Sequence, residues 1–170
     1  MSSSTRKSSD AEKIAAAVLT VSDSSARGER ADISGPTVAD ALEKKNFNVV
    51  AAKIVADNQV AIRKILIQLS MKARLVVTTG GTGIAPRDVT PEATRAVCKR
   101  LLDGIAERMR SEGAKKTPFA ALSRGVCGVR GKSLILNLPG SPKGAVESLE
   151  AVIDLLPHAV RLLAGQTAHD

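Results

Sequence analysis

Apolar residues occur along the chain in short continuous runs, separated by longer segments of mixed polarity. Four of the runs have the length of a β-strand: residues 14–21, 47–55, 74–79 and 133–138. Runs that are apolar at nearly every position are typical of strands covered on both faces. A further short strand is expected near 123–129. The alanine content of 14–21 leaves a helix open for that run alone.

The segments between and after these runs have apolar residues at helical spacing. They cover residues 34–46, 57–72, 90–113 and 141–165, of which the third holds one or two helices. Asp57 is expected to be the N-cap of the second segment. Thr90 is expected to be the N-cap of the third, with Pro91 at the first helical position. Pro157 should interrupt or bend the last helix, because proline removes a hydrogen bond from a helix interior.

This alternation predicts an α/β fold: a three-layer α/β/α sandwich with a mostly parallel sheet, in a single domain over residues 14–166. The polar start, residues 1–13, is expected to be a disordered tail. In sheets of this kind, ligands bind beyond the carboxyl ends of the strands, where the strand order reverses. Three polar loops follow predicted strands, at 22–34, 80–90 and 139–142, and could converge on one crevice there.

The composition narrows the kind of ligand. The 170 residues carry a net charge of +8, so the domain should attract an anion. Nucleic acid, an acidic surface and a phosphorylated small molecule all fit that charge. The chain has two Phe and neither Tyr nor Trp. It therefore lacks the aromatic faces on which nucleic-acid bases stack, and nucleic acid is not expected as a partner.

The cysteines and the N-terminus bear on the compartment. Cys98 and Cys127 match neither a disulfide framework nor a zinc-binding set, and are expected to be small buried hydrophobic residues. The polar N-terminus lacks the apolar core of a signal peptide, and no apolar run has the length that spans a membrane. A cytoplasmic protein without membrane contact is the expectation.

The stretch TTGGTGIAPRD, residues 78–88, carries the strongest chemical signal. Its glycines can adopt positive φ and bring backbone N–H groups close to an anion. Arg87 can bind a phosphate through two hydrogen bonds, and the Asp88 carboxylate can hold Mg²⁺. The stretch favours a phosphate cradle, although a tight turn alone would also use glycines.

Two other strand-end loops offer polar groups. In LPGSPKG, the amides of Gly140 and Ser141 can bind a second anionic group, or the stretch is simply a turn. Ser22 and Asp23 directly follow the first predicted strand, where polar side chains either bind a ligand or cap the backbone.

Residues for acid–base or nucleophilic catalysis are scarce. The two histidines are His158, in the last predicted helix, and His169, at the end of the chain. Neither assembles with a serine or cysteine into a nucleophilic triad. The stretch GVRGKS, residues 128–133, lacks the glycine spacing of a Walker A loop and precedes a strand instead of a helix. Chemistry that uses carboxylates, a metal ion and positioning remains, as in phosphoryl or nucleotidyl transfer.

Taken together, TTGGTG…PRDVTPEAT, SDSSARGERADISGP, NLPGSPKG and the closing LPHAVRLLAG resemble the Mog/MoaB family of molybdenum cofactor biosynthesis proteins. The same fold forms the G domains of the plant and animal cofactor enzymes. The resemblance covers residues 14–165. It implies a molybdopterin-binding domain that assembles into a homo-oligomer, either a trimer or a hexamer. It also implies adenylylation of the terminal phosphate of molybdopterin, with Mg-ATP as co-substrate and pyrophosphate as the second product.

The resemblance also implies roles for particular residues. Asp57 and Asp88 correspond to the functional aspartates, both catalytic and metal-binding. The substrate loops correspond to Thr79, Gly80, Gly81, Thr82 and Gly83, to Ser123 and Arg124, and to Pro139, Gly140, Ser141 and Pro142. Ser22, Asp23 and Arg87 join the expected substrate-binding set on chemical grounds.

Other functions remain open from the sequence. The chain ends soon after its last predicted helix, which places it nearer the shorter MoaB branch. A non-catalytic molybdopterin carrier would keep the same loops but show no dependence on ATP. A purely structural partner protein would bind neither ligand.

Overall fold

A computed structural model describes residues 12–167, so most of the predicted tail and His169 lie outside the described residues. The six strands are β1 Ile14–Val21, β2 Phe47–Val55, β3 Leu75–Thr79, β4 Arg100–Leu101, β5 Cys127–Arg130 and β6 Ser133–Leu138. The α-helices are α1 Asp23–Ala26, α2 Ser34–Glu43, α3 Gln59–Ser70, α4 Thr90–Val97, α5 Asp103–Ala114, α6 Pro142–Val152 and α7 Leu156–Leu163. Two 3-10 helices, η1 Pro118–Leu122 and η2 Ile153–Leu155, complete the fold.

The strands form one sheet in the order β2-β1-β3-β6-β5-β4. Strands β2, β1, β3 and β6 are parallel, whereas β5 and β4 run antiparallel to their neighbours. The chain leaves β1 toward β2 on one side and later returns to β3 on the other. The strand order therefore reverses between β1 and β3, where sheets of this type bind their ligands.

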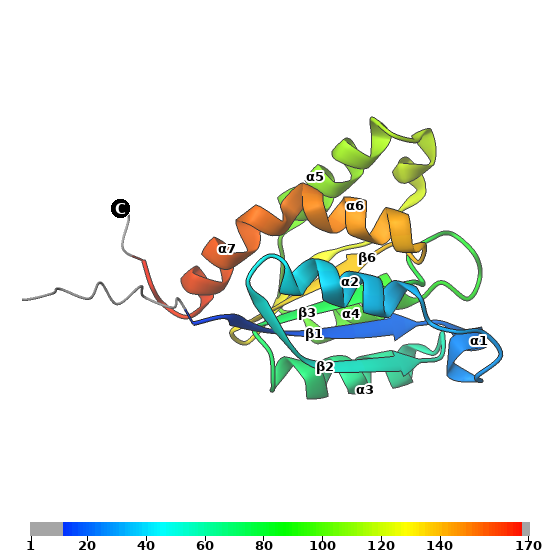
Figure 1. The fold of residues 1–170 in the computed structure, drawn as a ribbon, viewed down its shortest axis with the longest axis horizontal. Helices are drawn as coiled ribbons and strands as arrows, with labels where there is room; N and C mark the ends of the chain where they lie inside the picture. The colour runs from blue at the N-terminus through cyan, green and yellow to red at the C-terminus, as the bar shows by residue number, and fades with distance from the viewer. Residues whose placement is uncertain (1–11, 168–170) are drawn as a thin grey trace, which may run out of the picture.

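Helices cover both faces of the sheet (Figure 1). One core contains residues of α2, α5, α6 and α7, and the other contains residues of α3 and α4. Side chains of a strand point alternately to the two faces. In β1, accordingly, Val18 packs in the first core and its neighbours Ala17 and Leu19 pack in the second. The predicted three-layer α/β/α sandwich with a mostly parallel sheet is confirmed.

Two predicted caps are wrong. Asn58, not Asp57, is the N-cap of α3, and its side chain accepts a hydrogen bond from the amide of Ala61 at 2.9 Å. Thr90 is the first residue of α4, and its hydroxyl donates to the carbonyl of Gly80 at 2.9 Å. The Asp57 carboxylate instead accepts from the amide of Asp23, in the loop after β1, and Thr90 is bonded to the start of its own loop. These contacts override the local capping preference.

Other differences concern the ends and breaks of elements. The segment 90–113 contains two helices separated by the two-residue edge strand β4, which sequence spacing does not reveal. The last helical segment is interrupted by η2 immediately before α7, where Pro157 occupies one of the first two positions. The predicted interruption near Pro157 is therefore confirmed.

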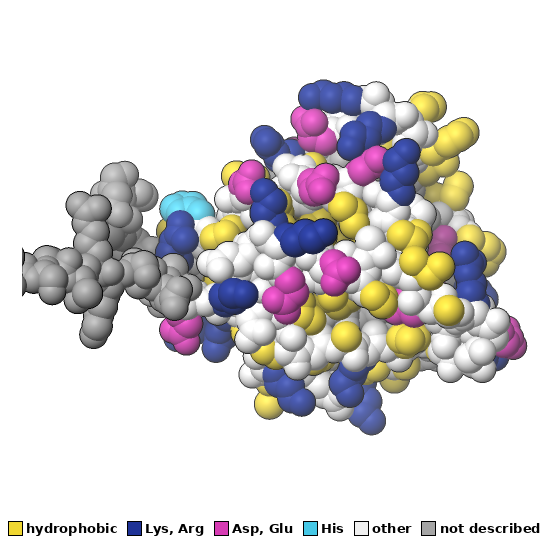
Figure 2. All heavy atoms as spheres, viewed as in Figure 1, with side chains coloured by type: hydrophobic (Ala, Val, Ile, Leu, Met, Phe, Trp, Pro, Cys, Tyr) yellow, Lys and Arg dark blue, Asp and Glu magenta, His cyan; other side chains and the backbone are white. Residues whose placement is uncertain are grey.

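Positive charge is dispersed on the face shown in Figure 2, where Lys and Arg side chains alternate with Asp and Glu. Cys127 is buried in the first core and Cys98 packs, half-buried, against the second. Burial raises the pKa of the Cys98 thiol to about 11 and that of Cys127 to about 12. None of the helices in the described part of the chain combines the length and apolar composition needed to cross a bilayer.

Candidate active site

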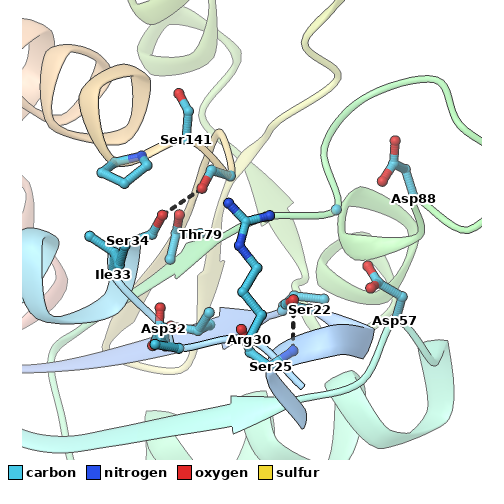
Figure 3. Close-up of a pocket in the computed structure, with 17 residues that line it drawn as sticks. Ser22, Ser25, Arg30, Asp32, Ile33, Ser34, Asp57, Thr79, Asp88 and Ser141 are labelled. Carbon is cyan, nitrogen blue, oxygen red and sulfur yellow. Dashed lines mark hydrogen bonds between the residues drawn. The ribbon is translucent and has the colours of Figure 1, made fainter. Parts of the chain in front are cut away.

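A crevice of about 490 Å³ lies beyond the carboxyl ends of β1 and β3 (Figure 3). The three predicted loops converge on it, each contributing residues to its lining. It is lined by Thr20, Val21, Ser22, Ser25, Arg30, Ala31, Asp32, Ile33, Ser34, Asp57, Thr79, Gly80, Gly81, Asp88, Gly140, Ser141 and Pro142. The crevice thus coincides with the reversal of strand order, as expected for a ligand site.

Two glycines of the loop after β3 have the positive φ that the sequence predicts. Gly80 has φ +102° and Gly81 has φ +69°. A Cβ at Gly80 would collide with the carbonyl of Val21, and one at Gly81 would collide with the Thr90 hydroxyl. The absent side chains therefore point toward neighbouring backbone and side chains of the protein. These glycines permit close packing of β1, β3 and α4, and the amide of Gly80 donates to the carbonyl of Leu138 at 3.1 Å.

Asp57 and Asp88, hereafter the carboxylate pair, stand together on one side of the crevice (Figure 3). Asp88 Oδ2 accepts a hydrogen bond from the amide of Ala85 at 3.0 Å, which fixes the turn of its own loop. Burial raises the pKa of Asp57, and the negative charges of Asp23 and Asp88 add to that effect. The site therefore concentrates negative charge that a cation would stabilise.

The carboxylate pair fits a Mg²⁺ ion that is shared with a substrate. No group of three or more His, Cys, Asp or Glu side chains within residues 12–167 is arranged to hold a metal by itself. Mg²⁺ commonly binds through one or two carboxylates together with substrate phosphates and water. Two carboxylates beside a crevice large enough for a phosphorylated substrate match that pattern of coordination.

Arg87 does not line the crevice. Its guanidinium pairs with Asp23, with Nε to Oδ2 at 2.5 Å and Nη2 to Oδ1 at 2.9 Å. Hydrogen bonding to Arg87 is the main reason that the pKa of Asp23 is lowered. Asp23 is likewise absent from the lining, so the structure places both residues beside the crevice as a brace between two loops.

Hydroxyl groups form the opposite side of the crevice (Figure 3), and we call Ser34, Thr79 and Ser141 the hydroxyl wall. Ser34 donates to the carbonyl of Gly140 at 2.5 Å, and Thr79 donates to the carbonyl of Pro139 at 2.6 Å. Ser141 instead caps α6 by accepting from the amide of Gly144 at 3.1 Å. The Ser141 proton therefore remains available to a ligand, whereas Ser34 and Thr79 chiefly position the loop after β6.

Several expected substrate-binding residues lie outside the lining: Asp23, Thr82, Gly83, Arg87, Ser123, Arg124 and Pro139. Arg124 shows the reason most clearly. Its Nε donates to the carbonyl of Gly83 and its Nη2 to the carbonyl of Asp88, both at 2.8 Å. It also forms an ion pair with Glu92. Arg124 thereby holds the ends of the loop that carries Asp88.

The lining also contains residues that no sequence pattern marks, chiefly Arg30 and Asp32. Asp32 accepts hydrogen bonds from the Thr20 hydroxyl at 2.7 Å and from the amide of Gly35 at 2.9 Å. It thus ties the end of the 22–34 loop to β1 and to the start of α2. The charge of Arg30 and Asp32, and their position in the polar loop after the first strand, could have suggested a role in binding. Their spacing, however, matches no motif that would distinguish them from other charged loop residues.

Comparison with known proteins identifies the family. The family described as "Probable molybdopterin binding domain" matches residues 17–158. The chain belongs to this family. The match begins within β1, and it includes the other five strands of the sheet and the three loops of the crevice.

The chain is similar to named proteins and to solved structures. The chain is 45% identical over 152 residues to a molybdopterin adenylyltransferase of Helicobacter pylori strain J99, covering 87% of this chain and 86% of that protein. It is 42% identical over 160 residues to the molybdenum cofactor synthesis protein cinnamon of Drosophila melanogaster, covering 92% of this chain and 27% of that protein. The crystal structure of the molybdopterin biosynthesis enzyme MoaB from Thermus thermophilus superposes with a TM-score of 0.85 and 52% identity, covering 89% of this chain and 97% of that one.

Proposed function

We propose that this protein takes part in molybdenum cofactor biosynthesis, binding molybdopterin and transferring the adenylyl group of ATP to its terminal phosphate. The observation that carries the proposal is the carboxylate pair, which faces a crevice formed by three strand-end loops at the reversal of strand order. Family membership and relatives named molybdopterin adenylyltransferase support the same reaction.

In the proposed reaction an oxygen of the molybdopterin phosphate attacks the α-phosphorus of ATP. A new oxygen–phosphorus bond forms, and the bond from the α-phosphorus to the bridging oxygen breaks. The electron pair of that bond leaves with pyrophosphate. A phosphate monoester has a second pKa of about 6 and is largely dianionic at neutral pH. It needs no general base, which agrees with a crevice whose described lining contains no histidine.

The protein's own groups would bind and orient two anionic substrates. The loop amides of Gly81 and Gly140 and the Ser141 hydroxyl would donate hydrogen bonds to phosphate oxygens. Asp57 and Asp88 would hold Mg²⁺ together with those oxygens, and the ion would supply charge neutralisation. Asp23 and Arg87 would keep the Asp57 and Asp88 loops in register.

The proposal includes the setting of the reaction. A cytoplasmic protein would have access to ATP and Mg²⁺. A homo-oligomer, a trimer or a hexamer, is the assembly that the family resemblance implies.

The direct test is pyrophosphate release by the purified protein with molybdopterin, ATP and Mg²⁺. We expect release that depends on all three and that falls when Asp88 is replaced by Asn. Binding of molybdopterin without any release of pyrophosphate would instead support the non-catalytic carrier.

A further inference from the structure

Among the described residues that line the crevice, Arg30 is the one lysine or arginine. The same lining contains three carboxylates, those of Asp32, Asp57 and Asp88. The proposed reaction brings a triphosphate and a phosphate monoester into this negatively charged space. Like charges at close range are strongly unfavourable unless a cation lies between them. The positive charge of the Arg30 guanidinium would therefore stabilise phosphate groups bound in the crevice.

The two arginines that the sequence placed in the substrate-binding set, Arg87 and Arg124, are already engaged. Arg87 forms a two-bond ion pair with Asp23 and also donates to the carbonyl of Asp57. Arg124 donates to two loop carbonyls and pairs with Glu92. By contrast, within residues 12–167 the Arg30 side chain has no carboxylate partner, and its guanidinium makes no hydrogen bond.

The loop that carries Arg30 is fixed on both sides of it. Before Arg30, the amide of Glu29 donates to the carbonyl of Ser24 at 2.9 Å. After it, Asp32 is held by the Thr20 hydroxyl and by the amide of Gly35. A pinned backbone with an unpaired side chain presents the guanidinium to the crevice at little further cost in backbone entropy.

Figure 3 shows where the side chain goes. Arg30 extends from its loop into the crevice, and its guanidinium lies between the hydroxyl wall and the carboxylate pair. A phosphate group bound there would contact Arg30 on one side and would be within reach of the loop amides on the other. A guanidinium can donate two parallel hydrogen bonds to such a group.

We propose that Arg30 is the phosphate-binding residue of the crevice, and that it binds a phosphate group of the substrates in the role that the sequence suggested for Arg87. The identity of the phosphate rests on the proposed function. Two sources share the chemistry: the triphosphate of ATP and the terminal phosphate of molybdopterin. The geometry places Arg30 opposite the carboxylate pair, so the phosphate would be held between the cation and the metal-binding side.

The test compares Arg30→Gln and Arg30→Lys with the wild-type protein by titration calorimetry. The matched control is Arg27→Gln, three residues earlier in the same loop, because Arg27 pairs with Glu29 outside the crevice. The probes are ATP, inorganic tripolyphosphate and molybdopterin, each with Mg²⁺ and at two salt concentrations. Arg30 is exposed, so its substitution should leave the unfolding temperature unchanged.

We expect Arg30→Gln to weaken binding of at least one probe by about tenfold or more, and to reduce the salt dependence of that binding. Arg30→Lys should recover only part of the affinity, because an ammonium group cannot donate two parallel bonds in a plane. Weaker binding of ATP and tripolyphosphate would assign Arg30 to the triphosphate, and weaker binding of molybdopterin alone would assign it to the terminal phosphate.

Equal dissociation constants for Arg30→Gln and wild type with all three probes would overturn the proposal while leaving adenylyl transfer standing. A wild-type protein that binds none of the probes would overturn it as well. Conversely, tripolyphosphate binding that depends on Arg30, in a protein that never releases pyrophosphate, would support the assignment of Arg30 and contradict the adenylyltransferase function.

Discussion

Asp23 and Asp57 each accept a hydrogen bond from the other's backbone amide. The amide of Asp23 donates to Asp57 Oδ2 at 2.9 Å, and the amide of Asp57 donates to Asp23 Oδ1 at 3.0 Å. This reciprocal pair joins the loop after β1 to the loop after β2, across the first two strands of the sheet. It fixes the orientation of the Asp57 carboxylate before any ligand binds.

Ionisation costs less free energy at Asp23 than at Asp57 in the folded protein. Arg87 lowers the pKa of Asp23, whereas burial and neighbouring carboxylates raise the pKa of Asp57. A raised pKa means that ionised Asp57 destabilises the folded state without a cation. Perturbed carboxylates of this kind are common at functional sites, where stability is exchanged for reactivity or ligand affinity.

Asp57→Asn should therefore change the pH dependence of stability. Because the pKa of Asp57 is raised in the folded state, this residue makes a contribution to the unfolding free energy of the wild-type protein. That contribution is complete below about pH 4 and is lost as the pH rises through the folded pKa. The variant has no charge at this position and so lacks that loss, while its side-chain amide oxygen can still accept from the amide of Asp23. Its unfolding temperature relative to wild type should increase between about pH 4 and pH 7.5. A difference that stays constant or falls over that range would contradict the inferred environment of Asp57.

Asp88→Asn should keep the fold and reduce pyrophosphate release by about a hundredfold or more. The amide oxygen of Asn can accept from Ala85 as Asp88 does, so the turn is preserved while the negative charge is removed. Asp40→Asn, an exposed change of the same charge on α2, serves as the control and should retain activity. Full activity of Asp88→Asn would show that the metal is bound elsewhere.

The fold was predictable because its signals are local. The strands 14–21, 47–55 and 133–138 appear in the structure with the predicted bounds, since their apolar runs are bounded by polar loops. The edge strand β4 was not predicted, because a segment of two residues is too short to show a periodic spacing of apolar residues. Its pairing with β5 supplies the hydrogen bonds that define it.

The site was only partly predictable, because only its local features can be read from the sequence. Glycines and loops at strand ends are readable, and the three loops do converge on one crevice. Arg87 lies outside the lining because it pairs with Asp23, which is 64 residues away in sequence. Arg30 was overlooked because no neighbouring residue distinguishes it from a charged side chain on a surface loop. Long-range pairing decides which arginine is free, and sequence does not reveal such pairing.

Gly81→Ala should destabilise the protein as well as weaken ligand binding. Positive φ alone costs a residue with a side chain about 1–2 kcal/mol, and a Cβ at Gly81 would also collide with the Thr90 hydroxyl. Gly131→Ala is the control, because Gly131 has φ +57° with nothing near its missing Cβ. The unfolding temperature should fall further for Gly81→Ala, and equal decreases would contradict the predicted clash.

The thiols of Cys98 and Cys127 should resist alkylation in the native protein. Their raised pKa values of about 11 and about 12 leave little thiolate at pH 8. Iodoacetamide should react more slowly than with a free thiol, by about a hundredfold or more at each site. Mass spectrometry should show both sites modified once the protein is unfolded in denaturant. Rapid native labelling of either site would show that the core around it opens.

Arg124→Met should destabilise the loop that carries Asp88, because three contacts of the guanidinium are lost. Burial alone would raise the pKa of Glu92, but hydrogen bonding to Arg124 and its charge bring that pKa below its usual value. Removing Arg124 leaves the Glu92 carboxylate without its partner, and its Oε2 is already buried without a hydrogen bond among the described residues. Arg124→Met should therefore lower both the unfolding free energy and the rate of pyrophosphate release.

A double-mutant cycle separates this bracing role from direct substrate binding. Glu92→Gln removes the stranded charge, so the Arg124→Met/Glu92→Gln variant should be more stable than the sum of the single changes predicts, by about 0.5–1 kcal/mol. Denaturant unfolding measures that coupling. The rate of pyrophosphate release should remain low in the double variant, because the carbonyls of Gly83 and Asp88 still lack their donor. If Arg124 instead binds substrate, Arg124→Met would raise KM. The unfolding free energy would then stay at its wild-type value, and the coupling free energy would be near zero.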